Sequence, residues 1–214
     1  MKNGTCFLVG ASEIARPFSP REGDFVIAAD GGYDRLLPLG VRPDLLIGDM
    51  DSIAALPAGI ETRLFPVRKD ETDLFLAFRE GFARGYRAFR LVGAGGGLED
   101  HAFANYALLY AARLAGCRAV METAFGEIRV IVNERAVLKG EPDCRFSAFA
   151  FAGPARGVSV RGMAYACEDI ALSPEYPLCV SNRFLDRDGE IEVRDGALLI
   201  MTERKNPPAA REGT

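Results

Sequence analysis

The sequence predicts an α/β domain with a mainly parallel sheet, followed by an all-β sandwich domain. In the first half, short apolar runs typical of buried strands alternate with segments whose apolar residues recur at helical spacing. After about residue 123, the apolar runs are separated by Gly or Pro every several residues. We therefore expect an α/β domain over residues 1–123, a β-sandwich domain over residues 124–204 and a flexible tail over residues 205–214.

The elements of the first half follow from these periods. Six apolar runs predict buried strands: Thr5–Val9, Phe25–Ala29, Leu45–Ile47, Arg63–Val67, Ala88–Val92 and Arg118–Met121. Two sets of apolar residues at helical spacing each predict a helix with one buried face: Leu74, Phe75, Phe78 and Phe82, and then Phe103, Leu108, Leu109, Ala112 and Leu114. We expect the second helix to end near Gly116.

The second half contains short segments that predict strands and almost no helical spacing. The strands are expected at Ile128–Val132, Ala136–Leu138, Phe146–Ala150, Val158–Arg161, Leu178–Ser181, Ile191–Val193 and Ala197–Met201. The dipeptides Asp188-Gly189 and Asp195-Gly196 are typical of hairpin turns.

Composition and charge exclude several classes of protein. The 214 residues include 26 Lys or Arg and 30 Asp or Glu, so the formal net charge is −4, whereas general nucleic-acid binders usually carry a basic excess. No apolar run reaches the roughly 18–20 residues of a membrane span, and the apolar run near the N-terminus is too short for a signal peptide. The five cysteines form no C-x-x-C pair, so we expect a reduced, cytoplasmic protein.

The motifs of several enzyme classes are missing from the sequence. With one histidine, His101, a His-rich metal site is excluded. The sequence has no G-x-S-x-G nucleophile elbow, no H-E-x-x-H zinc motif and no G-x-x-x-x-G-K-[ST] phosphate loop.

Acidic residues follow four successive predicted strands of the first half. They are Asp30, then Asp49 and Asp51, then Asp70 and Asp73, and then Asp100. Because the carboxyl ends of parallel strands meet at one edge of a sheet, we expect these carboxylates along the same rim. Crowded carboxylates repel one another unless a cation neutralises them, and a small set of oxygen ligands with room for phosphate suits Mg²⁺.

Glycines and a lysine accompany these acids. Gly31 and Gly32 follow Asp30, and the run Gly93–Gly97 lets backbone amides approach an anion closely. Lys69 supplies positive charge beside Asp70. With Mg²⁺, this combination predicts the transfer of a phosphoryl or pyrophosphoryl group from a nucleotide.

Each feature taken alone also has a structural explanation. Asp70 is a suitable N-cap for the helix that follows, with Asp73 favourable in its first turn. The glycines are also typical of ordinary tight turns. His101 could have a structural role, and Asn105, one helical turn later, could be solvated. The joint placement of acids after four successive strands favours a functional site.

These blocks, in this order and spacing, resemble the thiamine pyrophosphokinase (thiamine diphosphokinase) family. The blocks are Asp30-Gly31-Gly32, Pro43–Ser52 with Gly48-Asp49-Met50-Asp51, Lys69-Asp70-Glu71-Thr72-Asp73, and Gly93–His101 with Asn105. The resemblance covers the first half well and continues more weakly through Gly157–Tyr165 and Ser181-Asn182.

The resemblance implies a homodimer of chains with an N-terminal catalytic α/β domain and a C-terminal β-sandwich. Thiamine would lie between the α/β domain of one subunit and the β domain of the other. The implied reaction is ATP + thiamine → thiamine diphosphate + AMP, with Mg²⁺ held by Asp49, Asp51 and Asp73.

The resemblance also implies the roles of further residues. Asp100 joins the three metal ligands as a catalytic residue, and Asp30, Asp100, Ser181 and Asn182 match positions near thiamine. The implied ATP contacts are Asp30, Gly31, Gly32, Lys69, Asp70, Thr72, Gly93, Gly96, Gly97, His101 and Asn105.

The chain departs from the family pattern in its glycine block. The family usually has Gly-Gly-Arg-x-Asp-His, preceded by threonine, whereas this chain has Gly96-Gly97-Leu98-Glu99-Asp100-His101 preceded by Gly95. Two alternatives therefore stay open: a related diphosphokinase that acts on a hydroxymethylpterin-like alcohol, and a non-catalytic module that binds thiamine or a nucleotide. The retained acids argue against the second alternative, and Ser181-Asn182 favours thiamine over the pterin.

Overall fold

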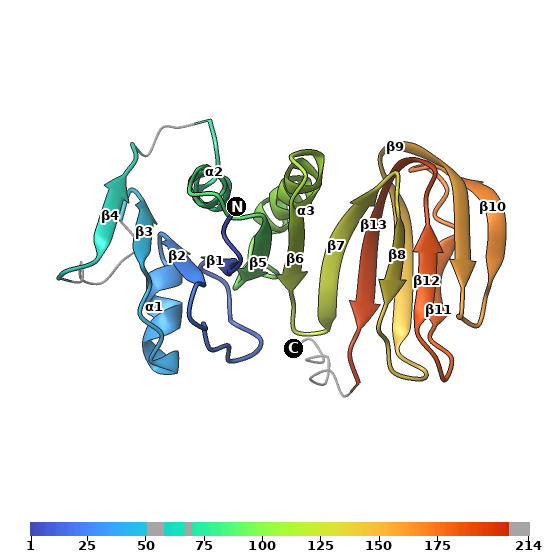
Figure 1. Cartoon of the computed structure of the whole chain (residues 1–214), viewed down its shortest axis with the longest axis horizontal. Helices are drawn as coiled ribbons and strands as arrows, with labels where there is room; N and C mark the ends of the chain where they lie inside the picture. Colours follow the sequence, from blue (N-terminus) through green and yellow to red (C-terminus); the bar gives the residue numbers. More distant parts are fainter. Residues whose placement is uncertain (51–57, 67–69, 206–214) are drawn as a thin grey trace. The chain divides into compact units, whose positions relative to one another are not determined.

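The chain divides into two units, Met1–Thr123 and Ala124–Thr214, in the computed structural model, which describes residues 1–50, 58–66 and 70–205 (Figure 1). Strands predominate among the described residues, and helices are few. None of the helices in these ranges has the length and apolar character needed to cross a membrane. Of the tail expected from the sequence, residues 206–214 lie outside the described residues.

A six-stranded sheet organises the first unit. Its strands are β1 (Thr5–Val9), β2 (Phe25–Ala29), β3 (Leu45–Gly48), β4 (Glu61–Leu64), β5 (Ala88–Val92) and β6 (Arg118–Glu122). They lie in the order β4-β3-β2-β1-β5-β6, and every pair of neighbours in this order is parallel. The carboxyl ends of all six strands therefore lie at the same edge.

Helices cover both faces of this sheet. They are α1 (Gly32–Leu36), which continues into the short 3₁₀ turn η1 (Leu37–Leu39), then α2 (Asp73–Ala83) and α3 (Glu99–Leu114). Leu36 of α1 shares a buried cluster with Phe7 of β1. Phe78 of α2 packs on Phe89 of β5, with ring centroids 4.9 Å apart, and Phe89 is the register partner of Cys6. Because Cys6 and Phe7 are adjacent in a strand, they point to opposite faces, so α1 and α2 cover opposite faces.

The second unit is built from antiparallel strands that form two sheets. The strands are β7 (Gly126–Val132), β8 (Arg135–Leu138), β9 (Arg145–Arg161), β10 (Cys167–Leu172), β11 (Cys179–Arg183), β12 (Gly189–Glu192) and β13 (Asp195–Glu203). The first half of β9 pairs with β13 and β11, and its second half pairs with β10 and β12. The long strand β9 therefore belongs to both sheets, with an irregular segment at Ala152 (φ 61°) between its halves.

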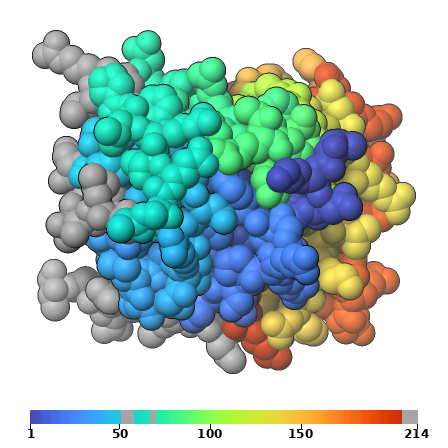
Figure 2. All heavy atoms as spheres, turned by 60° about the vertical axis from the view of Figure 1, so that its left-hand side comes forward, coloured from blue at the N-terminus to red at the C-terminus, as the bar shows by residue number. Residues whose placement is uncertain are grey.

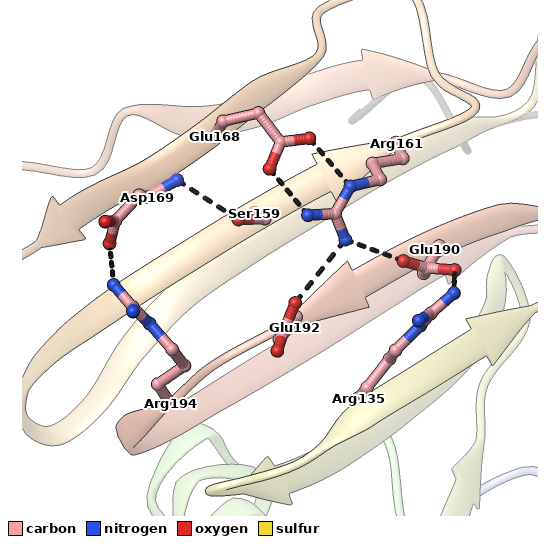
Figure 3. Close-up of polar contacts among 8 residues, drawn as sticks. All are labelled: Arg135, Ser159, Arg161, Glu168, Asp169, Glu190, Glu192 and Arg194. Atoms are coloured by element: carbon pink, nitrogen blue, oxygen red, sulfur yellow. Dashed lines mark hydrogen bonds and ion pairs between the residues drawn. The ribbon is translucent and has the colours of Figure 1, made fainter.

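The inward-facing residues of the two sheets form one core. Phe146 and Ala148 from the first half of β9 and Val158 and Val160 from the second half are fully buried in the same cluster. On the other face of the second sheet, charged side chains alternate in sign from strand to strand (Figure 3). Arg135 of β8 pairs with Glu190 of β12, Glu190 with Arg161 of β9, and Arg161 with Glu168 of β10.

Several sequence expectations about individual elements are wrong. The strand expected at Arg63–Val67 starts earlier, at Glu61, and the four residues of β4 are all exposed at the surface of the first unit (Figure 2). The strands expected at Phe146–Ala150 and Val158–Arg161 are one strand, β9, and strand β10 was not expected.

The two Asp-Gly dipeptides do not close hairpins. Gly189 begins β12, which pairs with β8 and β9, and Asp195-Gly196 begins β13, which pairs with β7 and β9. Phe103 and Leu114, both expected on the buried face of their helix, are 65% and 61% exposed.

Candidate functional site

The order of the strands marks a crevice at the carboxyl edge of the first unit's sheet. The chain leaves β1 to add β2, β3 and β4 on one side, and then adds β5 and β6 on the other side of β1. The direction of the connections therefore reverses between β1 and β5. In open α/β sheets, ligands bind at such a switch point, outside the carboxyl ends of the strands. The turns that border this point are Gly10–Ser12 after β1 and Gly93–Gly97 after β5.

These two turns are in direct contact. The backbone N–H of Ser12 donates to the carbonyl of Gly93 at 2.9 Å, and the Ser12 hydroxyl donates to the carbonyl of Gly96 at 3.1 Å. Gly93 has a φ of 61°, and a Cβ built on it would lie 2.6 Å from the carbonyl oxygen of Gly10, so this position requires glycine. The crevice is therefore bordered by backbone, which suits the close approach of phosphate oxygens.

Carboxylates border the same edge after β2 and β3. Asp30 and Asp49 directly follow these neighbouring strands, and both are half-buried. The Oδ1 atom of Asp30 accepts a hydrogen bond from the backbone N–H of Met50 at 3.2 Å. Asp30 (φ 48°) and Met50 (φ 65°) have left-handed backbone conformations that are uncommon for residues other than glycine. The structure thus brings together the two loops that carry Asp30 and Asp49.

The start of α3 follows the glycine turn after β5. Leu98 is the N-cap residue and is 68% exposed. Asp100 and His101 lie in the first turn and are exposed, and the Asp100 carboxylate accepts from the His101 backbone N–H at 2.8 Å. Asn105, one turn later, is buried rather than solvated, and its Nδ2 donates to the carbonyl of Ala94 at 2.8 Å. Asn105 therefore ties α3 to the glycine turn.

The start of α2 carries the next predicted site residues. Thr72 is the N-cap residue, and its hydroxyl oxygen accepts from the backbone N–H of Phe75 at 3.3 Å. Asp73 is the first helical residue and is half-buried, whereas Asp70 is exposed and is not the cap. Lys69 and Asp51 lie outside the described residues.

The described part of the first unit offers oxygen donors for a metal ion without a complete ligand set. Over residues 1–50, 58–66 and 70–205, no three His, Cys, Asp or Glu side chains gather as a metal-binding group. Asp51, which the resemblance places among the ligands, is not one of these residues. The donors that border the crevice, Asp30 and Asp49, are carboxylates, the ligand type that Mg²⁺ prefers.

Ser181 and Asn182 belong to β11 of the second unit and differ in accessibility. Ser181 is exposed and has a φ of 58°. Asn182 is 4% exposed: its Oδ1 accepts from the backbone N–H groups of Tyr165 (2.9 Å) and Arg183 (2.8 Å), and its Nδ2 donates to the Tyr165 carbonyl (2.7 Å). The Asn182 side chain therefore holds the backbone of Tyr165, whose own side chain is 74% exposed.

Two features of these sites were not found from the sequence. The Gly10–Ser12 turn was not singled out, although small residues directly after the apolar run Thr5–Val9 are a usable signal for a tight turn. The hydrogen bonds between the Asn182 side chain and the Tyr165 backbone join positions 17 residues apart, and no local sequence pattern indicates them.

Comparisons with known proteins identify relatives of this chain. Residues 21–121 match the family described as "Thiamin pyrophosphokinase, catalytic domain". A thiamine pyrophosphokinase from Bacillus subtilis (strain 168) is 24% identical over 185 residues, which cover 82% of this chain and 85% of the relative.

Solved structures share the fold of the chain. The crystal structure of thiamine pyrophosphokinase from Bacillus subtilis superposes with a TM-score of 0.84 at 20% identity, covering 94% of this chain and 100% of that one. The crystal structure of thiamin pyrophosphokinase from Geobacillus thermodenitrificans superposes with a TM-score of 0.81 at 23% identity. The match covers 94% of this chain and 98% of that one. The thiamin pyrophosphokinase from Candida albicans superposes with a TM-score of 0.76 at 12% identity. The match covers 94% of this chain and 89% of that one. Residues 21–121 of the chain are thus similar to the catalytic domain of thiamin pyrophosphokinases, and the chain shares the fold of solved thiamine pyrophosphokinases.

Proposed function

We propose that this chain transfers a pyrophosphoryl group from ATP to the hydroxyl of thiamine, which gives thiamine diphosphate and AMP. The observation that carries the proposal is the contact between two turns at the switch point, beside the loops of Asp30 and Asp49. These turns offer backbone to a polyphosphate, and the neighbouring carboxylates offer oxygen ligands to its metal ion. The names of the relatives supply thiamine as the acceptor.

We assign the phosphates of ATP to the glycine turns. The backbone of Gly93, Gly96 and Gly97 borders the crevice, and Ser12 fixes this turn through two hydrogen bonds. Gly31 and Gly32 lie at the start of α1, where backbone N–H groups favour an anion, and Lys69 would add a point charge. We assign Thr72, Asp70, His101 and Asn105 to the support and lining of the same site, with Asn105 acting through Ala94.

We assign Mg²⁺ to the carboxylates Asp49, Asp51 and Asp73. Mg²⁺ held by these residues would act as a Lewis acid that offsets negative charge on the phosphates. Asp30 is held by the Met50 backbone, so we expect it to orient the loop of Asp49 and the bound substrates. We assign Asp100, which is exposed in the first turn of α3, to a position near the reacting groups.

We assign thiamine to the second unit of a partner subunit in a cytoplasmic homodimer. The exposed residues at this site are Ser181 and Tyr165, and the buried Asn182 holds Tyr165 in place. Asn182 would therefore act as a positioning residue rather than through direct contact. A reducing compartment suits the five free cysteines.

The test is AMP release by the purified protein with ATP, Mg²⁺ and either thiamine or a hydroxymethylpterin. We expect AMP and thiamine diphosphate in equal amounts with thiamine and no reaction with the pterin. Asp49→Asn should lower the rate at least about 100-fold, since it removes one charge from the metal ligands. A melting curve shows whether this variant is folded.

The two alternatives predict different results in the same assay. Turnover with the pterin and not with thiamine would establish the related diphosphokinase. Thiamine or nucleotide binding with no AMP release, at any Mg²⁺ concentration, would establish a binding module and overturn the proposed reaction.

A further inference from the structure

Two partly exposed cysteines lie on edge strands of the two sheets in the second unit. Cys167 begins β10 and Cys179 begins β11, and within the described residues each of these strands pairs only with β9. The other three cysteines, Cys6, Cys117 and Cys144, are buried. Cys167 and Cys179 are thus the cysteines that small reagents can reach.

The register of the two strands turns both thiols toward the core. Cys167 is the partner of Val160 on β9, and Cys179 is the partner of Ala148 on the other half of β9. Directly paired residues of antiparallel strands point to the same face, and Val160 and Ala148 are both fully buried in the core between the sheets. Cys167 and Cys179 pack against this same core from the two sheets.

The two thiol groups are also neighbours. The pKa of the Cys179 thiol is raised to about 11, first by burial and then by the charge of Cys167 and a hydrogen bond with the Cys167 side chain. The chain that enters β10 runs along β11, because Ala164 donates to the Arg183 carbonyl at 2.9 Å and Asn182 brackets Tyr165. A contact between sulfur atoms of edge strands leaves only a small movement before an S–S bond of about 2.05 Å can form.

We propose that Cys167 and Cys179 are a redox-active pair that forms a reversible disulfide between the two sheets, with low-molecular-weight disulfides such as oxidised glutathione as the oxidant. The Cys167 thiolate attacks one sulfur of the oxidant, and one glutathione thiolate leaves and takes up a proton. Cys179 then attacks the Cys167 sulfur of the mixed disulfide, and the second glutathione leaves as the thiol. The two cysteines lose two electrons and two protons, and one glutathione disulfide becomes two thiols.

The high pKa of Cys179 makes the second step slow and decides which sulfur is attacked during reduction. Few Cys179 side chains are thiolates at neutral pH, so the intramolecular attack limits the rate. A thiol of high pKa is also a poor leaving group, so a reductant should attack the Cys179 sulfur and release Cys167 as the thiolate. The bond would join the start of β10 to the start of β11 and stabilise two strands that have one neighbour each.

The sequence allows an unambiguous mapping of this bond. Trypsin releases both cysteines in one peptide, Gly162–Arg183, because no Lys or Arg lies between Arg161 and Arg183. Further cleavage after Glu168 and Glu175 separates Cys167 from Cys179 unless a disulfide joins them.

The experiment incubates the full chain with oxidised glutathione, blocks the remaining thiols and maps the peptides by mass before and after reduction. We expect the joined peptide in the wild type, with Cys144 of the same unit left as a free thiol. Oxidation should raise Tm by about 4–10 °C, and dithiothreitol should reverse this. Cys167→Ser should give no joined peptide and no shift, and Cys179→Ser should stop at a glutathione adduct on Cys167.

Two results would overturn the proposal. One is a wild-type chain in which Cys167 and Cys179 stay free or each carry glutathione after prolonged oxidation. The other is a joined peptide that contains Cys144 in place of either residue. If a serine variant does not fold, as its melting curve reports, the corresponding alanine variant replaces it. Each readout is independent of activity toward thiamine.

Discussion

Asn182 shows how a residue that resembles a ligand contact can serve the backbone instead. Its side chain satisfies the N–H and carbonyl of Tyr165 and the N–H of Arg183. Asn182→Ala would leave these partly buried groups without this partner, at about 1–3 kcal/mol each where water cannot replace the lost bond. We expect a fall in Tm of at least about 5 °C together with a raised KM for thiamine.

Its neighbours supply the controls for this prediction. Ser181→Ala changes an exposed side chain and should alter stability by less than about 0.5 kcal/mol. Asn182→Asp keeps the acceptor atoms and loses the donor to the Tyr165 carbonyl. Its Tm should therefore lie between the values for the wild type and for Asn182→Ala. Equal melting temperatures for the wild type and the three variants would show that the hydrogen bonds between Asn182 and the backbone do not stabilise the fold.

Ser12 joins the two turns at the switch point, and its loss should affect ATP more than thiamine. Ser12→Ala removes the hydrogen bond to the Gly96 carbonyl, which contributes about 0.5–1.5 kcal/mol to the ordering of the glycine turn. We expect the KM for ATP to rise about 2- to 10-fold with a smaller change for thiamine. Ser12→Thr keeps the hydroxyl and should restore much of the effect. An unchanged KM for ATP would separate this turn from the phosphates.

Leu98 stands where the family usually has arginine, and the structure leaves it room to change. The side chain is 68% exposed at the N-cap of α3, so Leu98→Arg should leave Tm unchanged. A charged hydrogen bond to phosphate contributes about 1.5–3 kcal/mol, so the KM for ATP should fall about 10-fold or more. Leu114→Arg adds the same charge at the other, exposed end of α3 and is the matched control. Equal ATP kinetics in both variants would contradict the assignment of this loop.

The candidate site was predictable from sequence where a local pattern exists. Asp30 and Asp49 each follow a buried run directly, and the parallel sheet places both at one edge. Ser12 was not predictable, because its partner Gly96 lies 84 residues away. The burial of Asn105 was not predictable either, since only the contact with Ala94 distinguishes it from a solvated helical residue.

At the scale of elements, the sequence located those strands whose two faces are both buried. The strands β1, β2 and β5 have the predicted bounds, because apolar residues fill all but one position of β1 and β5 and every position of β2. The strand β4 carries Glu61, Thr62 and Arg63 in exposed positions, so its apolar signal lies too far along the chain. The strand β10 has Glu168 and Asp169 in its middle, and Asp169 (φ 54°) breaks the alternation of a regular strand.

The ion pairs of the second sheet among Arg135, Glu190, Arg161 and Glu168, here called the charged ladder, predict how the stability of these strands depends on pH. Hydrogen bonds from Arg161 lower the pKa values of Glu168 and Glu190 below the ordinary value of 4.5. Because the folded pKa values are the lower ones, the contribution is complete above the unfolded pKa and is lost as pH falls through the folded values. Arg161→Gln should therefore lower Tm at pH 7, and the difference from wild type should shrink below about pH 4.5.

An exposed ion pair of the same unit provides the reference for this measurement. Arg156→Gln removes a contact with Asp195 in which both side chains are 68% exposed, and it should change Tm little at any pH. A difference between wild type and Arg161→Gln that stays constant from pH 7 to pH 3.5 would show that the ladder contributes through packing and not through charge.

At the scale of the whole molecule, the proposed chemistry and the proposed acceptor site lie in different units. The phosphate-binding turns and carboxylates belong to Met1–Thr123, and Ser181 and Tyr165 belong to Ala124–Thr214. In the homodimer that we propose, each active site takes one unit from each subunit. When one chain carries a substitution in its first unit and its partner carries one in its second unit, both substitutions fall in the same active site. The other active site of the dimer then carries neither.

Mixed dimers of two inactive variants test this arrangement. Asp49→Asn disables the first unit, and Ser181→Arg places bulk and positive charge at an exposed position that would face the thiazolium cation of thiamine. In a heterodimer with shared sites, one site carries both lesions and the other carries neither. After random exchange, half of the dimers are heterodimers with one intact site in two, so activity should reach about a quarter of the wild-type value. If each site lay within one subunit, every site would carry a lesion, and verified exchange would restore nothing.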